Sequence, residues 1–135
     1  MKQFPKTLKP VDSSAFVELQ MQKILQKHST DKDQQSVCML MDHQESRQDL
    51  WLIYELCAGR TLNELLFQVK GEFFKGERIY MVHHGAFYHH IRQSTELLRS
   101  FLAKMSSALA LFDRLGIVHA DLKPDNIIVD YDCEE

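Results

Sequence analysis

Two segments of the chain have apolar residues at helical spacing. In 16–28 these residues recur at i, i+4, i+7 and i+8, which is one face of a helix; they are Val17, Met21, Ile24 and Leu25. Asp12, Ser13 and Ser14 precede it as candidate N-caps. In 97–115 the 3.6-residue period lasts nearly five turns and ends before Gly116, a typical helix-terminating residue. The pattern predicts one helix in each segment.

Shorter apolar runs predict strands. Segments 37–41 and 50–56 are joined by a polar turn at 44–49. Because the second run is apolar except for Glu55, we expect it to be covered on both faces. Further short strands are expected at 1–4, 117–118 and 127–129. A short helix is expected at 62–69, with Thr61 as its cap and Glu64 in its first turn.

The remaining segments lack a clear period. Residues 28–35 are polar and rich in turn formers, which predicts a turn. Residues 70–94 combine aromatic residues with the pairs His83-His84 and His89-His90, and we expect an ordered loop or insertion there. Histidine pairs can hold zinc or copper. Solvated histidines, packing of the aromatic residues, and a docking surface for a protein partner or substrate are the alternatives.

Composition and charge exclude several classes of protein. Among 135 residues, 16 Lys and Arg stand against 19 Asp and Glu, so no basic surplus indicates binding to nucleic acid. No apolar run approaches the roughly 18 residues needed to span a membrane, and no secretory signal is recognisable. The three cysteines form no close pair. We therefore expect reduced thiols and a cytoplasmic protein, with a nuclear location as the alternative.

The segment between the last two predicted strands carries the candidate chemistry. It reads His119-Ala120-Asp121-Leu122-Lys123-Pro124-Asp125-Asn126. Phosphoryl transfer to a hydroxyl requires a carboxylate to orient the hydroxyl or accept its proton, a cation to neutralise the phosphoryl group, and an oxygen ligand for magnesium. Asp121, Lys123 and Asn126 supply these three groups within one short loop.

This segment resembles the catalytic loop of the eukaryotic protein kinases, His-Arg-Asp-x-x-x-x-Asn, in its serine/threonine form Asp-Leu-Lys-Pro-x-Asn. The resemblance implies that Asp121 is the catalytic base, Lys123 the phosphate-neutralising residue and Asn126 a magnesium ligand, with ATP and Mg²⁺ as cofactors. The family's arginine is replaced by Ala120. That arginine pairs with the phosphorylated activation loop, so any activity is not expected to depend on that switch.

The run 50–59 is similar to strand five and the hinge of a kinase small lobe. The resemblance makes Tyr54 the gatekeeper and assigns adenine binding to the backbones of Glu55 and Cys57, with Ile128 on the floor of the adenine pocket. An ordinary buried strand would have the same pattern, so this part of the resemblance is weak.

The helix at 16–28 is similar to helix C, most closely that of the dual-specificity tyrosine-regulated kinases. The resemblance implies that Glu18 pairs with the strand-three lysine. Lys2 lies 16 residues before Glu18, a usual separation, whereas Lys9 lies only nine before it. We choose Lys2. The alternative is that all three are solvated surface charges.

The implied fold is α+β, a partial two-lobed kinase. Residues 1–57 would form part of the small lobe, and 58–135 part of the large lobe with an insertion at about 70–94. The chain holds neither a glycine-rich phosphate loop nor Asp-Phe-Gly, so it resembles the middle of a kinase cut at both ends. We expect the 135-residue polypeptide alone to be inactive, because phosphoryl transfer depends on precise positioning.

The implied function is transfer of the ATP γ-phosphoryl group to protein serine or threonine hydroxyls. One alternative is a catalytically inactive kinase-like binding or scaffold module. A second is a small-molecule phosphotransferase, although the Lys123-Pro124 pair favours the protein-kinase form. A third is a metal-binding module based on the histidine pairs alone.

Overall fold

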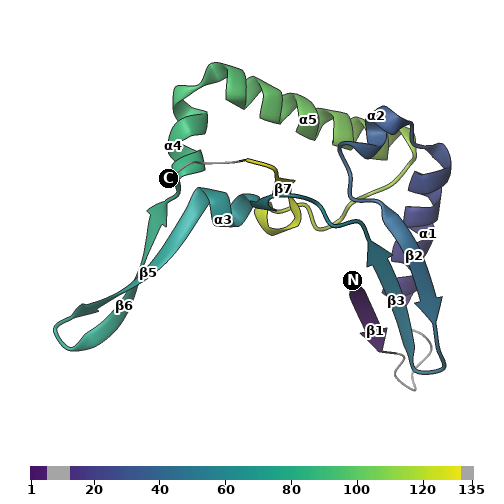
Figure 1. Ribbon diagram of the computed structural model, residues 1–135, viewed down its shortest axis with the longest axis horizontal. Coiled ribbons are helices and arrows are strands. Elements are labelled where there is room, and N and C mark those ends of the chain that lie inside the picture. The colour runs from purple at the N-terminus through teal and green to yellow at the C-terminus, as the bar shows by residue number, and fades with distance from the viewer. Residues whose placement is uncertain (6–12, 132–135) are drawn as a thin grey trace. The chain divides into compact units, whose positions relative to one another are not determined.

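The computed structural model describes residues 1–5 and 13–131, and its elements are drawn in Figure 1. Helices and antiparallel strands are mixed, so the predicted α+β class is confirmed. The chain divides into two compact units: residues 1–56 with 104–118, and residues 57–103 with 119–135. Each unit is described by itself below. The predicted lobe boundary after residue 57 stays a prediction.

The first unit contains a three-stranded antiparallel sheet in the order β1-β3-β2. The strands are β1 (Lys2–Pro5), β2 (Leu40–Glu45) and β3 (Asp49–Tyr54). On β3, Leu50 and Leu52 are buried while Trp51 and Ile53 are half-buried. The expectation that both faces of this strand are covered was therefore wrong, because its side chains alternate between a closed face and a partly open one.

The helix α1 (Ser13–His28) packs against this sheet. The helix predicted at 16–28 is confirmed, and it ends at His28 as expected, but it begins three residues earlier. The candidate caps Ser13 and Ser14 therefore lie inside the helix, and the candidate cap Asp12 lies outside the described residues. Ala15 and Leu19 lie one turn apart and form one core with the leucines of β2 and β3. Burial of these side chains fixes the helix on the sheet, and it places Glu18 beside β1 and β3.

The predicted turn at 28–35 contains a one-turn helix, α2 (Asp31–Gln34). Thr30 and Asp33 form a capping box: each side chain accepts a hydrogen bond from the other residue's backbone N–H. Arg114 adds an ion pair to Asp33 at 2.7 Å. The capping box and this ion pair stabilise a helix that is too short to show an apolar period. The pattern of apolar residues in the sequence therefore did not predict it.

The second unit is built around α3 (Leu62–Leu66), which is capped by Thr61 and Glu64 as predicted. Leu62, Leu65 and Phe87 form its buried core, and Phe87 lies on α4 (Ala86–Gln93). The helix is shorter than the predicted 62–69, because the chain turns into a strand at Phe67. Two short strands, β4 (Arg60–Thr61) and β7 (Ile128–Val129), pair beside α3.

The segment expected to be an ordered loop or insertion is a β-hairpin followed by α4, so the expected loop is wrong, whereas the insertion stays a prediction. Strands β5 (Phe67–Phe74) and β6 (Glu77–His84) pair without a register shift over their whole length. Lys75 and Gly76 form the two-residue turn, both with positive φ (50° and 85°), as a type I′ hairpin requires. Figure 1 shows the hairpin as a twisted two-stranded ribbon.

The long helix α5 (Thr95–Arg114) confirms the strongest period in the sequence. Of its apolar residues, Leu111 is buried while Leu98, Leu102 and Leu109 are exposed. The strand expected at 117–118 is wrong: the chain there has no regular structure, whereas β7 confirms the strand at 127–129. Within 1–5 and 13–131, no helix has the length and apolar character needed to cross a membrane.

Candidate phosphoryl-transfer site

The loop 119–126 brings its three candidate catalytic side chains together. Lys123 Nζ lies 3.0 Å from Asp121 Oδ2. Asn126 Nδ2 donates to the same Asp121 Oδ2 at 2.9 Å and to the Asp121 backbone carbonyl at 2.8 Å. A one-turn 3-10 helix, η1 (Pro124–Asn126), starts at the proline and turns Asn126 back toward Asp121. A carboxylate, an ammonium and an amide thus converge within six residues.

The charge of Asp121 follows from these contacts. The hydrogen bond from Lys123, then that from Asn126, lower the pKa of the Asp121 carboxyl below its ordinary value. The side chain is 65% exposed, so the carboxylate is open to an incoming hydroxyl. Asp121 is therefore ionised at neutral pH and is a weak base, suited to orienting a hydroxyl and accepting its proton late in the reaction.

The backbone before Asp121 is strained at Ala120. This residue has a φ of +60°, in the left-handed region, which costs an L-residue about 1–2 kcal/mol. The Asp121 amide donates to the His119 carbonyl at 2.8 Å, which closes a tight turn around Ala120. Strain of this kind persists where the surrounding contacts determine the conformation. Here the turn directs the Asp121 side chain to Lys123 and Asn126.

The β4–β7 pair anchors the C-terminal side of this loop. Arg60 is in register with Val129, and the Leu62 amide donates to the Ile127 carbonyl at 2.7 Å. Gly59 permits this approach: its φ is +100°, and a Cβ there would lie 2.2 Å from the Val129 carbonyl oxygen. Gly59 was not among the residues predicted to shape the site. Its packing role depends on a partner 70 residues away, which no local pattern reveals.

A second group of candidate residues meets in the first unit. Lys2 Nζ lies 2.6 Å from Glu18 Oε1. The Tyr54 hydroxyl donates to that same oxygen at 2.5 Å. Burial, and then the Glu18 carboxylate, raise the pKa of Tyr54 above its ordinary value, so its hydroxyl keeps its proton. Lys9 lies outside the described residues. The contact between Tyr54 and Glu18, 36 residues apart, was not expected from the sequence.

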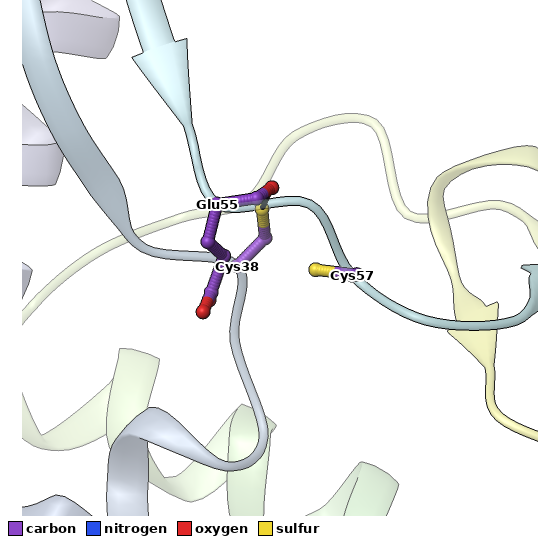
Figure 2. Close-up of side chains that lie close together, drawn as sticks. All are labelled: Cys38, Glu55 and Cys57. Atoms are coloured by element: carbon purple, nitrogen blue, oxygen red, sulfur yellow. Dashed lines mark hydrogen bonds between the residues drawn. The ribbon is translucent and has the colours of Figure 1, made fainter.

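The remaining candidate residues follow β3 or lie on β7. The Glu55 amide donates to the Met39 carbonyl at 3.1 Å, and the Glu55 carbonyl accepts a weak hydrogen bond from the Cys38 thiol, Sγ to O 3.7 Å. Figure 2 shows Cys38 beside Glu55. Cys57 is a half-buried free thiol, and Ile128 is 48% exposed. The adenine-binding roles given to Glu55, Cys57 and Ile128 stay predictions.

His83 and His84 end β6, whereas His89 and His90 lie in the middle of α4. His84 stacks on Tyr88 with ring centroids 3.8 Å apart, and His90 bonds to the Tyr131 hydroxyl. In the described part of the chain, the four histidines do not gather three ligand atoms into one metal site. His84, His89 and His90 contact aromatic rings. Phe73, Phe74 and Tyr80 of the same segment are exposed, so packing of the aromatic residues is not confirmed for these three.

The sequence of the chain is similar to those of known protein kinases. The protein kinase domain family matches residues 1–134. Sperm motility kinase 3A and sperm motility kinase 2B of Mus musculus are each 30% identical over 104 residues, 74% of this chain and 16% of theirs. The serine/threonine-protein kinase ULK1 of Homo sapiens is 28% identical over 95 residues, 70% of this chain and 7% of its own. No solved structure matches the chain.

The chain therefore belongs to the protein kinase family, as the catalytic-loop resemblance predicted. It spans about a sixth of the length of the sperm motility kinases that it matches.

Proposed function

We propose that the protein containing this chain transfers the γ-phosphoryl group of ATP to serine or threonine hydroxyls of a protein substrate, with Mg²⁺ as the metal. The observation that carries the proposal is the convergence of Lys123 and Asn126 on the Asp121 carboxylate. The serine/threonine preference rests on the Lys123-Pro124 pair and on the name of one relative, a serine/threonine-protein kinase.

Each residue of the loop has a defined part in this chemistry. The Asp121 carboxylate accepts a hydrogen bond from the incoming hydroxyl. This hydrogen bond aligns the hydroxyl oxygen with the phosphorus, and the carboxylate later receives the proton. Lys123 places a positive charge beside the carboxylate, where the negative charge of the moving phosphoryl group needs neutralising. Positioning and electrostatic stabilisation supply most of the rate in such reactions.

Asn126 fits the role of a magnesium ligand. The two hydrogen bonds that the structure gives its side chain both use Nδ2, and they leave Oδ1 as the atom for a cation. Hard cations such as Mg²⁺ prefer oxygen ligands of this kind. When bound, the metal would neutralise and orient the phosphates. Asn126 alone is too few ligands for tight binding, so further ligands must come from the nucleotide and from other residues.

The experiment is a phosphorylation assay on the protein translated from the longest reading frame that contains this chain. It is incubated with radiolabelled ATP, Mg²⁺ and a mixture of peptides bearing serine, threonine or tyrosine, and the labelled amino acids are then identified. The proposal predicts phosphoserine or phosphothreonine that is abolished by chelation of the metal. Label on tyrosine only, or on a small molecule only, would overturn the specificity. No label at all would favour the scaffold alternative.

A further inference from the structure

The β5–β6 hairpin has an open edge along β5. The sheet contains only these two strands among the described residues, so the outer N–H and C=O groups of β5 have no strand partner there. The strand is eight residues long, contains no proline and has no bulge in its pairing with β6. Natural proteins protect such edges with prolines, bulges or short strands. This edge has none of these, which makes it able to pair with another strand.

One face of the hairpin is also apolar and open. The register places Val69 beside Val82 and Gly71 beside Tyr80, so these side chains share a face with Phe73. Val69, Phe73, Tyr80 and Val82 are between 65% and 79% exposed. Two-stranded ribbons are only marginally stable in water. Extension of the sheet by further strands would stabilise this one.

The sequence of β5 is complementary to itself. If two β5 strands pair antiparallel with Gly71 opposite Gly71, then Lys70 of each copy lies opposite Glu72 of the other. In the same register Val69 lies opposite Phe73. Opposite charges and apolar pairs at directly facing positions both stabilise antiparallel pairing. The single lysine that would otherwise guard this edge is thus matched by a glutamate of the second copy.

We propose that two copies of this chain associate through their β5 strands, centred on Gly71, to form a four-stranded sheet in the order β6-β5-β5-β6. The contact is isologous, with a twofold axis between the two glycines. The centre is covered on the apolar face, since a Cβ on Gly71 would lie 3.0 Å from Arg78 Nε and 3.4 Å from Tyr80 Cε1. Arg78 also stacks on the Tyr80 ring at 5.4 Å. This inference is independent of catalytic activity.

The test is sedimentation equilibrium of the 135-residue chain over a range of concentrations, with circular dichroism as a check on folding. The wild type is expected to show a monomer–dimer equilibrium. Lys70→Glu and Glu72→Lys each place like charges opposite one another twice, and each should raise the dissociation constant at least about tenfold. The double variant Lys70→Glu/Glu72→Lys restores both pairs, and it should return to within about threefold of the wild type.

Glu77→Lys is the matched control, because it reverses a charge on β6, away from the proposed edge. It should leave the dissociation constant within about threefold of the wild type. Amide hydrogen exchange adds a second measurement, in which β5 gains protection as the concentration rises and β6 does not. A chain that is monomeric at all concentrations would overturn the proposal, as would single reversals without effect or a double variant that fails to recover.

Discussion

The Tyr54 hydroxyl and Lys2 Nζ meet at one carboxylate oxygen, Oε1 of Glu18, at 2.5 and 2.6 Å. Tyr54 ends β3 and Lys2 opens β1, so the two groups hold α1 against the sheet from neighbouring strands. The Lys2 side chain is exposed, so its ion pair with Glu18 would by itself add little stability. The half-buried hydroxyl of Tyr54 makes the orientation of Glu18 definite.

Tyr54→Phe tests this contribution. The variant keeps the ring in the core with Ala15 and Leu19 and removes only the hydrogen bond. We expect the free energy of unfolding to fall by about 1.5–3 kcal/mol, the usual value for a hydrogen bond to a charged group. Urea unfolding followed by circular dichroism gives the value. Tyr80→Phe is the control, because its ring is 65% exposed on the hairpin; an equal loss in that variant would contradict the assignment.

The same hydroxyl predicts a dependence on alkaline pH. The pKa of Tyr54 is raised in the folded chain, first by burial and then by Glu18. The folded state therefore holds this proton more tightly than the unfolded state, so stability is complete below the ordinary tyrosine pKa and is lost as pH rises above it. Unfolding free energies measured from about pH 8 to about pH 11 should fall more steeply for the wild type than for Tyr54→Phe. Parallel curves would refute the prediction.

Gly59→Ala should destabilise the second unit strongly. The new Cβ would lie 2.2 Å from a backbone carbonyl that cannot move without breaking the β4–β7 pair, and the residue has a φ of +100°. Strain and overlap together should cost at least about 3 kcal/mol. Gly76→Ala isolates the strain, since φ there is +85° and no atom lies within 4 Å. Gly76→Ala should lower the free energy of unfolding by about 1–2 kcal/mol in the same urea experiment. Similar losses of stability in both variants would contradict the packing role of Gly59.

Acid should weaken the contact between α2 and α5. Hydrogen bonds from the Thr30 backbone and then from Arg114 lower the pKa of Asp33 from 3.8 to about 2. The folded chain therefore favours the ionised form, and this contribution is complete above pH 3.8 and is lost as pH falls through about 2. Asp33→Asn should flatten the loss of stability over that acid range, measured by thermal unfolding. Asp31→Asn, in the same short helix, should follow the wild-type curve. A flattened curve for this variant would show that the effect is not specific to Asp33.

The long helices and the catalytic loop could be predicted from the sequence because their signals are local. The 3.6-residue period defines α1 and α5, and the loop residues lie within six positions of one another. The hairpin could not be predicted in this way. Apolar and polar residues do alternate along β5, but β6 has four apolar residues in a row, Ile79 to Val82, and no such alternation. The turn is Lys75-Gly76 instead of the more familiar Asn-Gly.

The candidate site shows the same difference. The pairing of Glu18 with a lysine was implied by the kinase resemblance, and the separation along the chain selected Lys2. The Tyr54 contact and the close approach of Gly59 to Val129 arise only when distant strands meet. Residues 117–118 have the composition of a strand, but Val118 is 85% exposed and finds no strand to pair with in the described part of the chain. Whether a segment of two or three residues forms a strand therefore depends on the presence of a partner strand in the folded chain.

The most direct test of the account compares two aspartates of one loop in the protein translated from the longest reading frame containing this chain. Asp121 and Asp125 are both exposed, but only Asp121 is held by Lys123 and Asn126. The measurement is kcat/KM for phosphoryl transfer from Mg²⁺-ATP to a serine peptide. Asp121→Asn should lower it by at least about 10³-fold, whereas Asp125→Asn should change it less than about threefold. Equal activity of Asp121→Asn and the wild type would contradict the assignment of Asp121 as the catalytic base.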